Sequence, residues 1–212
     1  MRRCSLIGGL ATQVGLLIAL PATLLAAPIA HAGLVFSDEL GGFNLVSVSG
    51  QGTLEDPFVV TEEVSGDREI ILTIRNFSRD FGNRIGSQHV SAFAMKKVVI
   101  NKSNRVWRNY EMELREVTTR HSPYGDGLSF GQNSFIGSTY VESDFPRVQR
   151  FDEPEDTLGF SGADITPGSK AEFRFIISDM SPVSVFYLMQ VPLQPLSSNP
   201  TNDSPQWAAL PK

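Results

Sequence analysis

The chain has 212 residues and one cysteine, Cys4, which lies in an apolar N-terminal stretch that we expect to be removed. The remainder has no thiol, which excludes disulfides, thiolate catalysis and cysteine-ligated zinc. Such a chain must be stable through its core alone, and about 180 residues are enough to form one. The lack of cysteine fits a bacterial envelope or secreted protein better than a eukaryotic ectodomain.

Histidine is also scarce, since only His89 and His121 lie beyond the N-terminal stretch. Neither occurs in an H-x-H or H-E-x-x-H spacing, so the sequence gives no support to a two-histidine metal site. It also lacks the G-x-S-x-G pattern of a nucleophilic serine. Two enzymatic alternatives stay open: a hydrolase site assembled by the fold, with His121 beside carboxylates in a pocket, and a carboxylate pair for glycoside hydrolysis.

Basic residues are fewer than acidic ones. The chain has 18 Lys and Arg residues against 23 Asp and Glu, and two of the basic residues, Arg2 and Arg3, precede the apolar stretch. The rest of the chain thus carries 16 basic and 23 acidic side chains. This balance argues against nucleic acid as a partner. We expect any partner to be a protein or a surface polysaccharide.

The N-terminal stretch has the three-part layout of a secretory signal. Arg2 and Arg3 are followed by the uncharged residues 6–27, and then by Ala30-His31-Ala32, which places small residues where a signal peptidase cuts. We expect residues 1–32 to be a cleaved signal peptide. Export would lead to the periplasm or the medium of a Gram-negative bacterium, with no membrane span left after cleavage. An uncleaved membrane anchor is the alternative, because the apolar part approaches spanning length.

The rest of the chain shows short apolar alternations separated by turn residues. The sequence predicts strands over 43–48, 58–61, 69–77, 90–100, 105–117, 128–130 and 135–141. A helix with an apolar stripe from Trp107 to Val117 is the less favoured alternative for one of these segments. Residues 33–42 are predicted to be a short lead-in, and 142–162 to be irregular. The alternation slips at Lys96 and Lys97, which indicates a bend or a bulge.

Residues 164–191 give the clearest local pattern. A Pro-Gly turn at 167–168, alternation over 172–177, a turn at 179–182 and an apolar run to Val191 predict two strands joined by a short turn. The second strand is expected to be central because both of its faces are apolar. We expect 69–77 and 105–117 to be sheet neighbours of this pair, which should hold the core and carry no chemistry.

Eight or nine short strands, turn signals at roughly ten-residue spacing and no long helix predict an all-β fold. The expected form is an antiparallel β-sandwich, immunoglobulin-like or jelly-roll-like. We expect one domain over residues 33–195 and a disordered tail rich in Pro, Ser and Asn over 196–212. The pieces ILTIRNFS, VWRNYEMEL and ITPGSKAEFRFIIS resemble immunoglobulin-like modules of bacterial exported proteins. That resemblance implies a fold and no activity.

Carboxylates are the strongest chemical signal, and they gather in the segment 118–162. Flexible acidic loops supply the roughly six to eight oxygens that calcium prefers. We therefore predict a weak calcium site among the following residues: Asp126, Glu142, Asp144, Asp152 and Asp156. No EF-hand spacing is present, so the alternative is a solvated acidic loop that keeps the protein soluble.

Aromatic rings offer a second candidate site. Trp107 lies on the polar side of its predicted strand and Tyr124 lies in a Gly-rich loop, so these are the predicted ligand-binding rings, able to stack on a sugar face. Packing in the core is the simpler interpretation of Trp107. Together these features predict an exported, non-enzymatic structural or interaction module. A calcium-assisted carbohydrate- or ligand-binding module is the alternative function.

Overall fold

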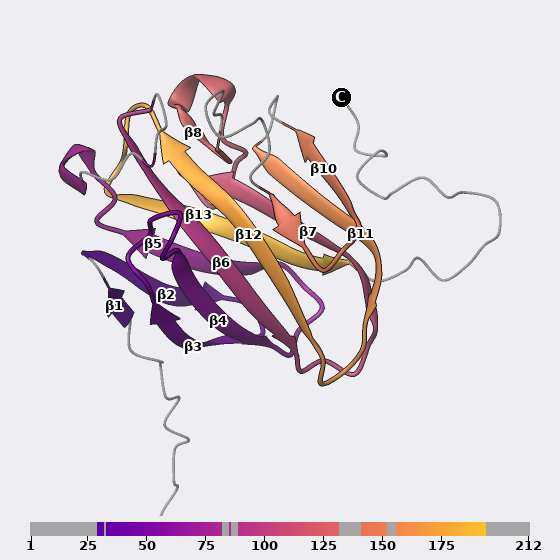
Figure 1. The fold of residues 1–212 in the computed structure, drawn as a ribbon. Helices are drawn as coiled ribbons and strands as arrows, with labels where there is room; N and C mark the ends of the chain where they lie inside the picture. Colours follow the sequence, from indigo (N-terminus) through magenta and orange to yellow (C-terminus); the bar gives the residue numbers. More distant parts are fainter. Residues whose placement is uncertain are drawn as a thin grey trace, which may run out of the picture.

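The computed structural model describes residues 29–31, 33–81, 85, 89–131, 141–151 and 156–193. Two β-sheets pack against each other around one apolar core and form a sandwich (Figure 1). Two short 3₁₀ segments accompany them, η1 (Arg79–Phe81) and η2 (Tyr124–Asp126). No helix in these described ranges is long and apolar enough to cross a membrane. The all-β prediction is confirmed.

The larger sheet has seven strands in the order β1-β2-β5-β13-β7-β11-β10. Its members are β1 (Ile29–His31), β2 (Leu34–Leu40), β5 (Ile70–Arg75), β13 (Val185–Leu193), β7 (Trp107–Arg115), β11 (Thr157–Ile165) and β10 (Arg147–Phe151). All of these pairings are antiparallel. Because β13 lies between β5 and β7, its predicted central position and its two predicted neighbours are confirmed. The same neighbours were predicted for the strand before it, β12 (Lys170–Asp179), and there the prediction is wrong, because β12 lies in the other sheet and pairs with β6 (Ser91–Asn101).

The smaller sheet has six strands in the order β3-β4-β6-β12-β8, and β9 also pairs with β12. Its members are β3 (Phe43–Ser49), β4 (Phe58–Val64), β6 (Ser91–Asn101), β12 (Lys170–Asp179), β8 (Leu128–Ser129) and β9 (Glu142–Ser143). β4 and β6 run parallel, so the prediction of a strictly antiparallel sandwich is wrong. The reason is topological: after β4 the chain crosses to β5 in the other sheet and returns as β6, which restores its direction.

The sandwich has more strands than the eight or nine predicted. β2 occupies the predicted lead-in, and β9, β10 and most of β11 occupy the segment 142–162 that was predicted to be irregular. These strands lie in the outer parts of their sheets, where a half-exposed strand needs no apolar run and leaves a weak pattern. The strand predicted over 135–141 falls almost wholly outside the described residues.

The turn after Asp179 passes from one sheet to the other. β12 pairs with β6 along its whole length, whereas β13 pairs with β5 and β7. Figure 1 shows β12 crossing in front of β13. The two strands that were predicted as a hydrogen-bonded pair therefore lie in different sheets. They face each other across the core and share no backbone pairing. Both contribute to that core, with Phe173 and Phe175 from β12 and Phe186 and Leu188 from β13.

A polar chain of side chains crosses this apolar core. Lys97 of β6 and Glu62 of β4 are both completely buried, and Lys97 Nζ lies 2.5 Å from Glu62 Oε1. Gln190 of β13 donates from Nε2 to Glu62 Oε2 at 3.2 Å. Tyr110 of β7 donates its hydroxyl to Gln190 Oε1 at 3.1 Å. These four side chains, which we call the core chain, connect the two sheets through the interior.

β1 lies within the segment 1–32 that is predicted to be a cleaved signal. It pairs with β2 at one edge of the seven-stranded sheet. Residues 1–28 and the predicted tail 196–212 lie outside the described residues. Cleavage after Ala32 stays a prediction, and it would leave β2 as the edge strand.

Candidate functional site

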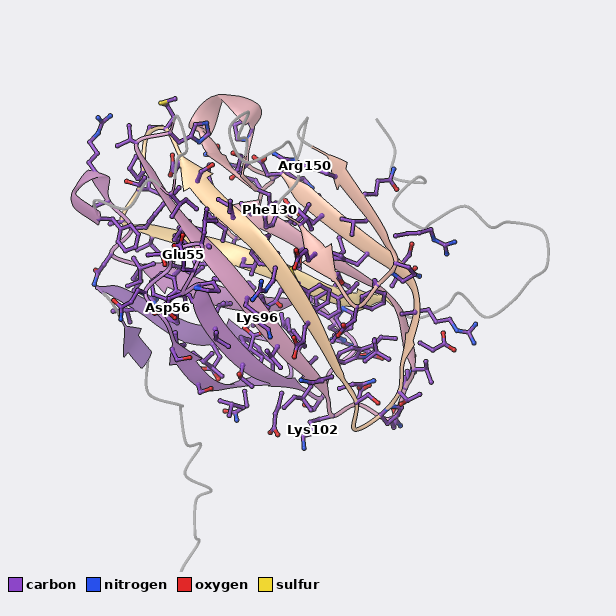
Figure 2. The ribbon with its side chains drawn as sticks, in the orientation of Figure 1. Glu55, Asp56, Lys96, Lys102, Phe130 and Arg150 are labelled. Carbon is purple, nitrogen blue, oxygen red and sulfur yellow. The ribbon has the colours of Figure 1, made fainter. Side chains whose placement is uncertain are left out.

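Three carboxylates near the start of β8 lie close enough for their charges to interact. Phe130, which directly follows β8, is labelled in Figure 2. Asp126 closes η2, Asp179 closes β12, and Glu116 follows β7. β8 joins these segments, because its Leu128 pairs with Asp179. We call Glu116, Asp126 and Asp179 the end cluster.

In each aspartate of the end cluster, one carboxylate oxygen accepts a hydrogen bond from the described part of the chain and the other does not. Leu128 N donates to Asp126 Oδ1 at 3.0 Å, and Ser181 N donates to Asp179 Oδ1 at 2.8 Å. Asp126 Oδ2 and Asp179 Oδ2 are buried and have no hydrogen-bond partner among the described residues. A buried carboxylate oxygen without a hydrogen-bond donor is unfavourable. The end cluster should therefore bind a proton, or a ligand that donates a hydrogen bond to these oxygens.

Burial and charge repulsion act together on these groups. The pKa of Asp179 is raised to about 6, first by burial and further by the charges of Glu116 and Asp126, while backbone hydrogen bonds from Ser181 and Val183 limit the rise. The pKa of Glu116 is also raised, first by burial and then by the charge of Asp126. Asp179 therefore changes its protonation near pH 6.

A cavity of about 230 Å³ adjoins the end cluster, and its lining includes His89, Ser129, Met180 and Ser181. Ser181 links the cavity to the cluster, because its hydroxyl donates to the Asp126 carbonyl oxygen at 2.5 Å. Burial lowers the pKa of His89, and a backbone hydrogen bond with Ser178 offsets part of that effect. The cavity is smaller than sites for drug-sized molecules, which begin at roughly 300 Å³, so it suits only a small group.

A second ionic group surrounds Glu113 in β7. Arg115 donates from Nε and Nη2 to the two oxygens of Glu113, each at 2.7 Å. His121 Nδ1 lies 2.6 Å from Glu113 Oε1. Both oxygens of Glu113 are therefore engaged, and this carboxylate is a pairing partner for two side chains. The cavity at the end cluster is lined by His89 and not by His121, and the hydrolase alternative stays a prediction.

Two members of the predicted calcium set lie beside β12. Asp144 Oδ2 accepts a hydrogen bond from Glu172 N at 2.9 Å. Arg174 Nη1 lies 3.9 Å from Glu142 Oε2, and both of these side chains are exposed. Asp144 thus attaches the short β9 segment to β12, whereas Glu142 makes only a long ion pair at the surface.

The other members of the set lie elsewhere. Asp126 belongs to the end cluster, and Asp156 is buried beside β7, where its carbonyl oxygen accepts a hydrogen bond from Leu114 N at 3.0 Å. Asp152 lies outside the described residues. Within the described part of the chain, no group of three or more His, Cys, Asp or Glu side chains is arranged to hold a metal ion. The calcium site stays a prediction that this geometry does not favour.

Trp107 is completely buried, so its predicted position on the polar side of the strand is wrong. Its Nε1 donates to Ser103 Oγ at 3.2 Å, and its ring packs against Tyr110 with centroids 5.8 Å apart. The alternation of β7 breaks here, opposite an irregularity in β11, so that two residues three positions apart both face inward. The ring has no face open to a sugar. Tyr124 lies in η2, and its side chain is outside the described part.

Sequence reasoning missed the end cluster and the core chain, for different reasons. Glu62 and Lys97 occupy inward-facing positions of alternating strands. A charged residue at a position where the alternation predicts an apolar one was the sequence feature that could have indicated a buried ion pair. The break in the apolar alternation at Lys97, which was predicted to be a bend or a bulge, is instead a buried lysine in a regular strand. Asp126, Asp179 and His89 come from separate segments, and no local pattern connects them.

Comparison with protein-family models, curated proteins and solved structures finds no match to this chain.

Proposed function

We propose that the chain is an exported, non-enzymatic β-sandwich that serves as a structural module in the periplasm or outside the cell. The core chain carries this proposal. Its four members, Lys97, Glu62, Gln190 and Tyr110, are completely buried and connect the two sheets at a place that no diffusing substrate reaches. Buried polar groups that satisfy one another fix a single arrangement of a core, which is what a module with a structural role requires.

The surface ion pairs support the same proposal. Glu172 of β12 lies 2.6 Å from Lys96 of the neighbouring strand and 2.6 Å from Lys170 of its own strand. These ion pairs hold side chains of the sheet together, which suits a structural role better than the binding of a charged ligand. The resemblance to immunoglobulin-like modules of exported proteins agrees with this role by analogy, and the immunoglobulin-like or jelly-roll-like topology belongs to the proposal.

Export is the first part to test. The full chain, expressed in a Gram-negative bacterium, should be recovered from the periplasm or the medium with a new N-terminus at Gly33. Cell fractionation and N-terminal sequencing measure this. A chain that stays in the cytoplasm with residues 1–32 intact would overturn the export part of the proposal.

The structural role is tested by complementation of a gene deletion in the source organism. A variant with His89→Gln and Asp179→Asn alters the end cavity and leaves the core chain intact. It should restore the trait lost in the deletion strain, because a structural module does not depend on that cavity. Thermal unfolding checks that the variant is folded. A folded variant that fails to complement would contradict the proposal.

A second candidate function is the binding of a small cation or hydrogen-bond donor at the end cavity. The observation that favours it is the pair of buried oxygens without partners, Asp126 Oδ2 and Asp179 Oδ2. Calorimetric titration with calcium tests the calcium-assisted form. Saturable heat that disappears in Asp126→Asn supports binding there, whereas no heat in the wild-type protein removes calcium as the ligand.

A further inference from the structure

The core chain places an amine, a carboxylate and a primary amide in contact. Glu62 holds the other two groups on its two oxygens: Lys97 Nζ lies 2.5 Å from Oε1, and Gln190 Nε2 donates to Oε2 at 3.2 Å. The amine and the amide therefore both lie within hydrogen-bond distance of one carboxylate. Lys97 comes from the smaller sheet and Gln190 from the larger one.

A hydroxyl group completes the arrangement. Tyr110 donates from its OH to Gln190 Oε1 at 3.1 Å, so it polarises the carbonyl group of the amide. Burial, and next the negative charge of Glu62, raise the pKa of Tyr110 well above its ordinary value, so the hydroxyl keeps its proton. A donor fixed at a carbonyl oxygen stabilises the negative charge that develops there when a nucleophile attacks the carbon.

Aromatic side chains close this place to water. Lys97 stands opposite Phe173 in the ladder between β6 and β12. The Phe173 ring lies 5.0 Å from the Tyr110 ring and 4.7 Å from the Phe160 ring, measured between centroids. Burial lowers the pKa of Lys97, although Glu62 opposes this effect. Desolvation favours the neutral amine, which is the nucleophilic form of lysine.

From this geometry we infer that Lys97 and Gln190 condense into an isopeptide bond that links β6 to β13. Glu62 takes a proton from Lys97 Nζ, and the free amine attacks Gln190 Cδ to form the Nζ–Cδ bond. The oxygen, now negative, is held by the Tyr110 hydroxyl. Glu62 delivers this proton to Nε2, and the Cδ–Nε2 bond breaks as the carbonyl re-forms. The proton that Nζ still carries in excess passes through Glu62 to the departing ammonia, so a neutral secondary amide remains and Glu62 is again a carboxylate. An amine and a primary amide become a secondary amide plus ammonia, with no change in oxidation state.

Such a bond would do what a disulfide does in other exported proteins. It would join the two sheets and close a long loop of the unfolded chain, which lowers the entropy of that state. The only cysteine is Cys4, so the remainder of the chain cannot form a disulfide. The inference does not depend on the proposed structural role, since either can hold without the other.

Mass spectrometry tests the inference on the purified full chain. The intact mass should be lower than the sequence mass, after signal processing, by one molecule of ammonia. Proteolysis should yield a branched peptide that contains both Lys97 and Gln190, with no cleavage by trypsin after Lys97. Fragmentation of that peptide distinguishes the cross-link from ammonia lost at an asparagine or a terminal glutamine.

Variants identify the roles of the four side chains. Glu62→Gln keeps the shape of the carboxylate but cannot carry the proton, and Gln190→Leu removes the amide, so both should abolish the mass loss. Tyr110→Phe should slow the reaction without changing its product. Lys96→Met is the matched control, because it alters the neighbouring lysine, and it should leave the mass loss unchanged.

The wild-type protein alone decides the matter if a variant fails to fold. Separate, unmodified peptides carrying Lys97 and Gln190, together with an intact mass equal to the sequence mass after prolonged incubation, would overturn the inference. A branched peptide that joins Lys97 to a different side chain would overturn it as well.

Discussion

Lys97 Nζ and Glu62 Oε1 lie 2.5 Å apart, and neither side chain is exposed to solvent. The adjacent lysine of the same strand, Lys96, makes an ion pair of almost the same length with Glu172, at 2.6 Å, with 26% of its side chain exposed. One strand thus places the same interaction in two environments. The two pairs have nearly the same length, so the loss of stability on removing one partner should differ because of desolvation and not because of distance.

Replacing Glu62 by Gln should lower the free energy of unfolding by about 3–5 kcal/mol, because it leaves the Lys97 ammonium buried without a counter-charge. Loss of the proposed cross-link would add to this decrease. Glu172→Gln makes the same chemical change on the outer face and should lower stability by about 1 kcal/mol or less. Urea unfolding of the three proteins measures both values, and equal effects of the two substitutions would contradict this prediction.

The core chain also shows where sequence reasoning succeeds and where it stops. Alternating or continuously apolar runs in 69–77, 105–117 and 164–191 predicted the strands β5, β7, β12 and β13 correctly, because strands that are buried along much of their length leave a strong apolar pattern. The same reasoning took Lys97 for a bend, since a lysine at an inward position contradicts the pattern unless a carboxylate from another strand receives it. Glu62 lies far from Lys97 in sequence, so only the fold reveals the pair.

The end cluster lay beyond sequence reasoning for a related reason. Asp126 was predicted as a calcium ligand from its acidic surroundings, whereas the structure places it next to Asp179, a residue from the predicted turn after a core strand. Segments that meet through sheet pairing, such as β8 and β12, leave no mark on the local pattern. The crossing of the chain between sheets after β4 and after β12 was unpredictable on the same grounds.

Gly127→Ala should lower stability by roughly 1–3 kcal/mol, since this position combines backbone strain with a steric clash. The residue has a φ of +90°, and an added Cβ would lie 2.9 Å from Met180 Cβ. Gly125→Ala is the matched control in the same loop, because nothing lies within 4 Å of its added Cβ. Unfolding in urea compares them. A Gly127→Ala protein as stable as the control would show that this loop accommodates a side chain.

Calcium should not change the thermal unfolding midpoint of the purified protein. Of the carboxylates beside β12 that were predicted as ligands, Asp144 accepts a hydrogen bond from the backbone of Glu172, and Glu142 lies at the surface near the cation of Arg174. Any ligand that binds only the folded state raises the midpoint. Melting curves with excess calcium and with a chelator measure the effect. A clear rise with calcium, reversed by the chelator, would restore the calcium-assisted alternative.

The stability of the protein should fall as the pH rises from about 4 to about 6, because Asp179 has an ordinary pKa of 3.8 and a folded-state pKa of about 6. In this window the folded protein still holds the proton while the unfolded chain has lost it. The stabilisation is complete below the lower value and is lost as the pH passes the higher one. A shift of this size corresponds to at most about 3 kcal/mol, and hydration from the adjoining cavity reduces it to about 1–2 kcal/mol.

Asp179→Asn removes the ionisation and should therefore stabilise the protein at pH 7, provided that the amide oxygen keeps the hydrogen bond from Ser181 N. At the acid end of the window, the variant and the wild type should be equally stable. Asp126→Asn removes only a neighbouring charge, so it should flatten the pH dependence in part, since burial is the larger cause of the shift. Urea unfolding across this pH range measures all three proteins. If Asp179→Asn kept the pH dependence of the wild type, the proton would reside on another group, and Glu116, whose pKa is raised by the same surroundings, would be the next to replace.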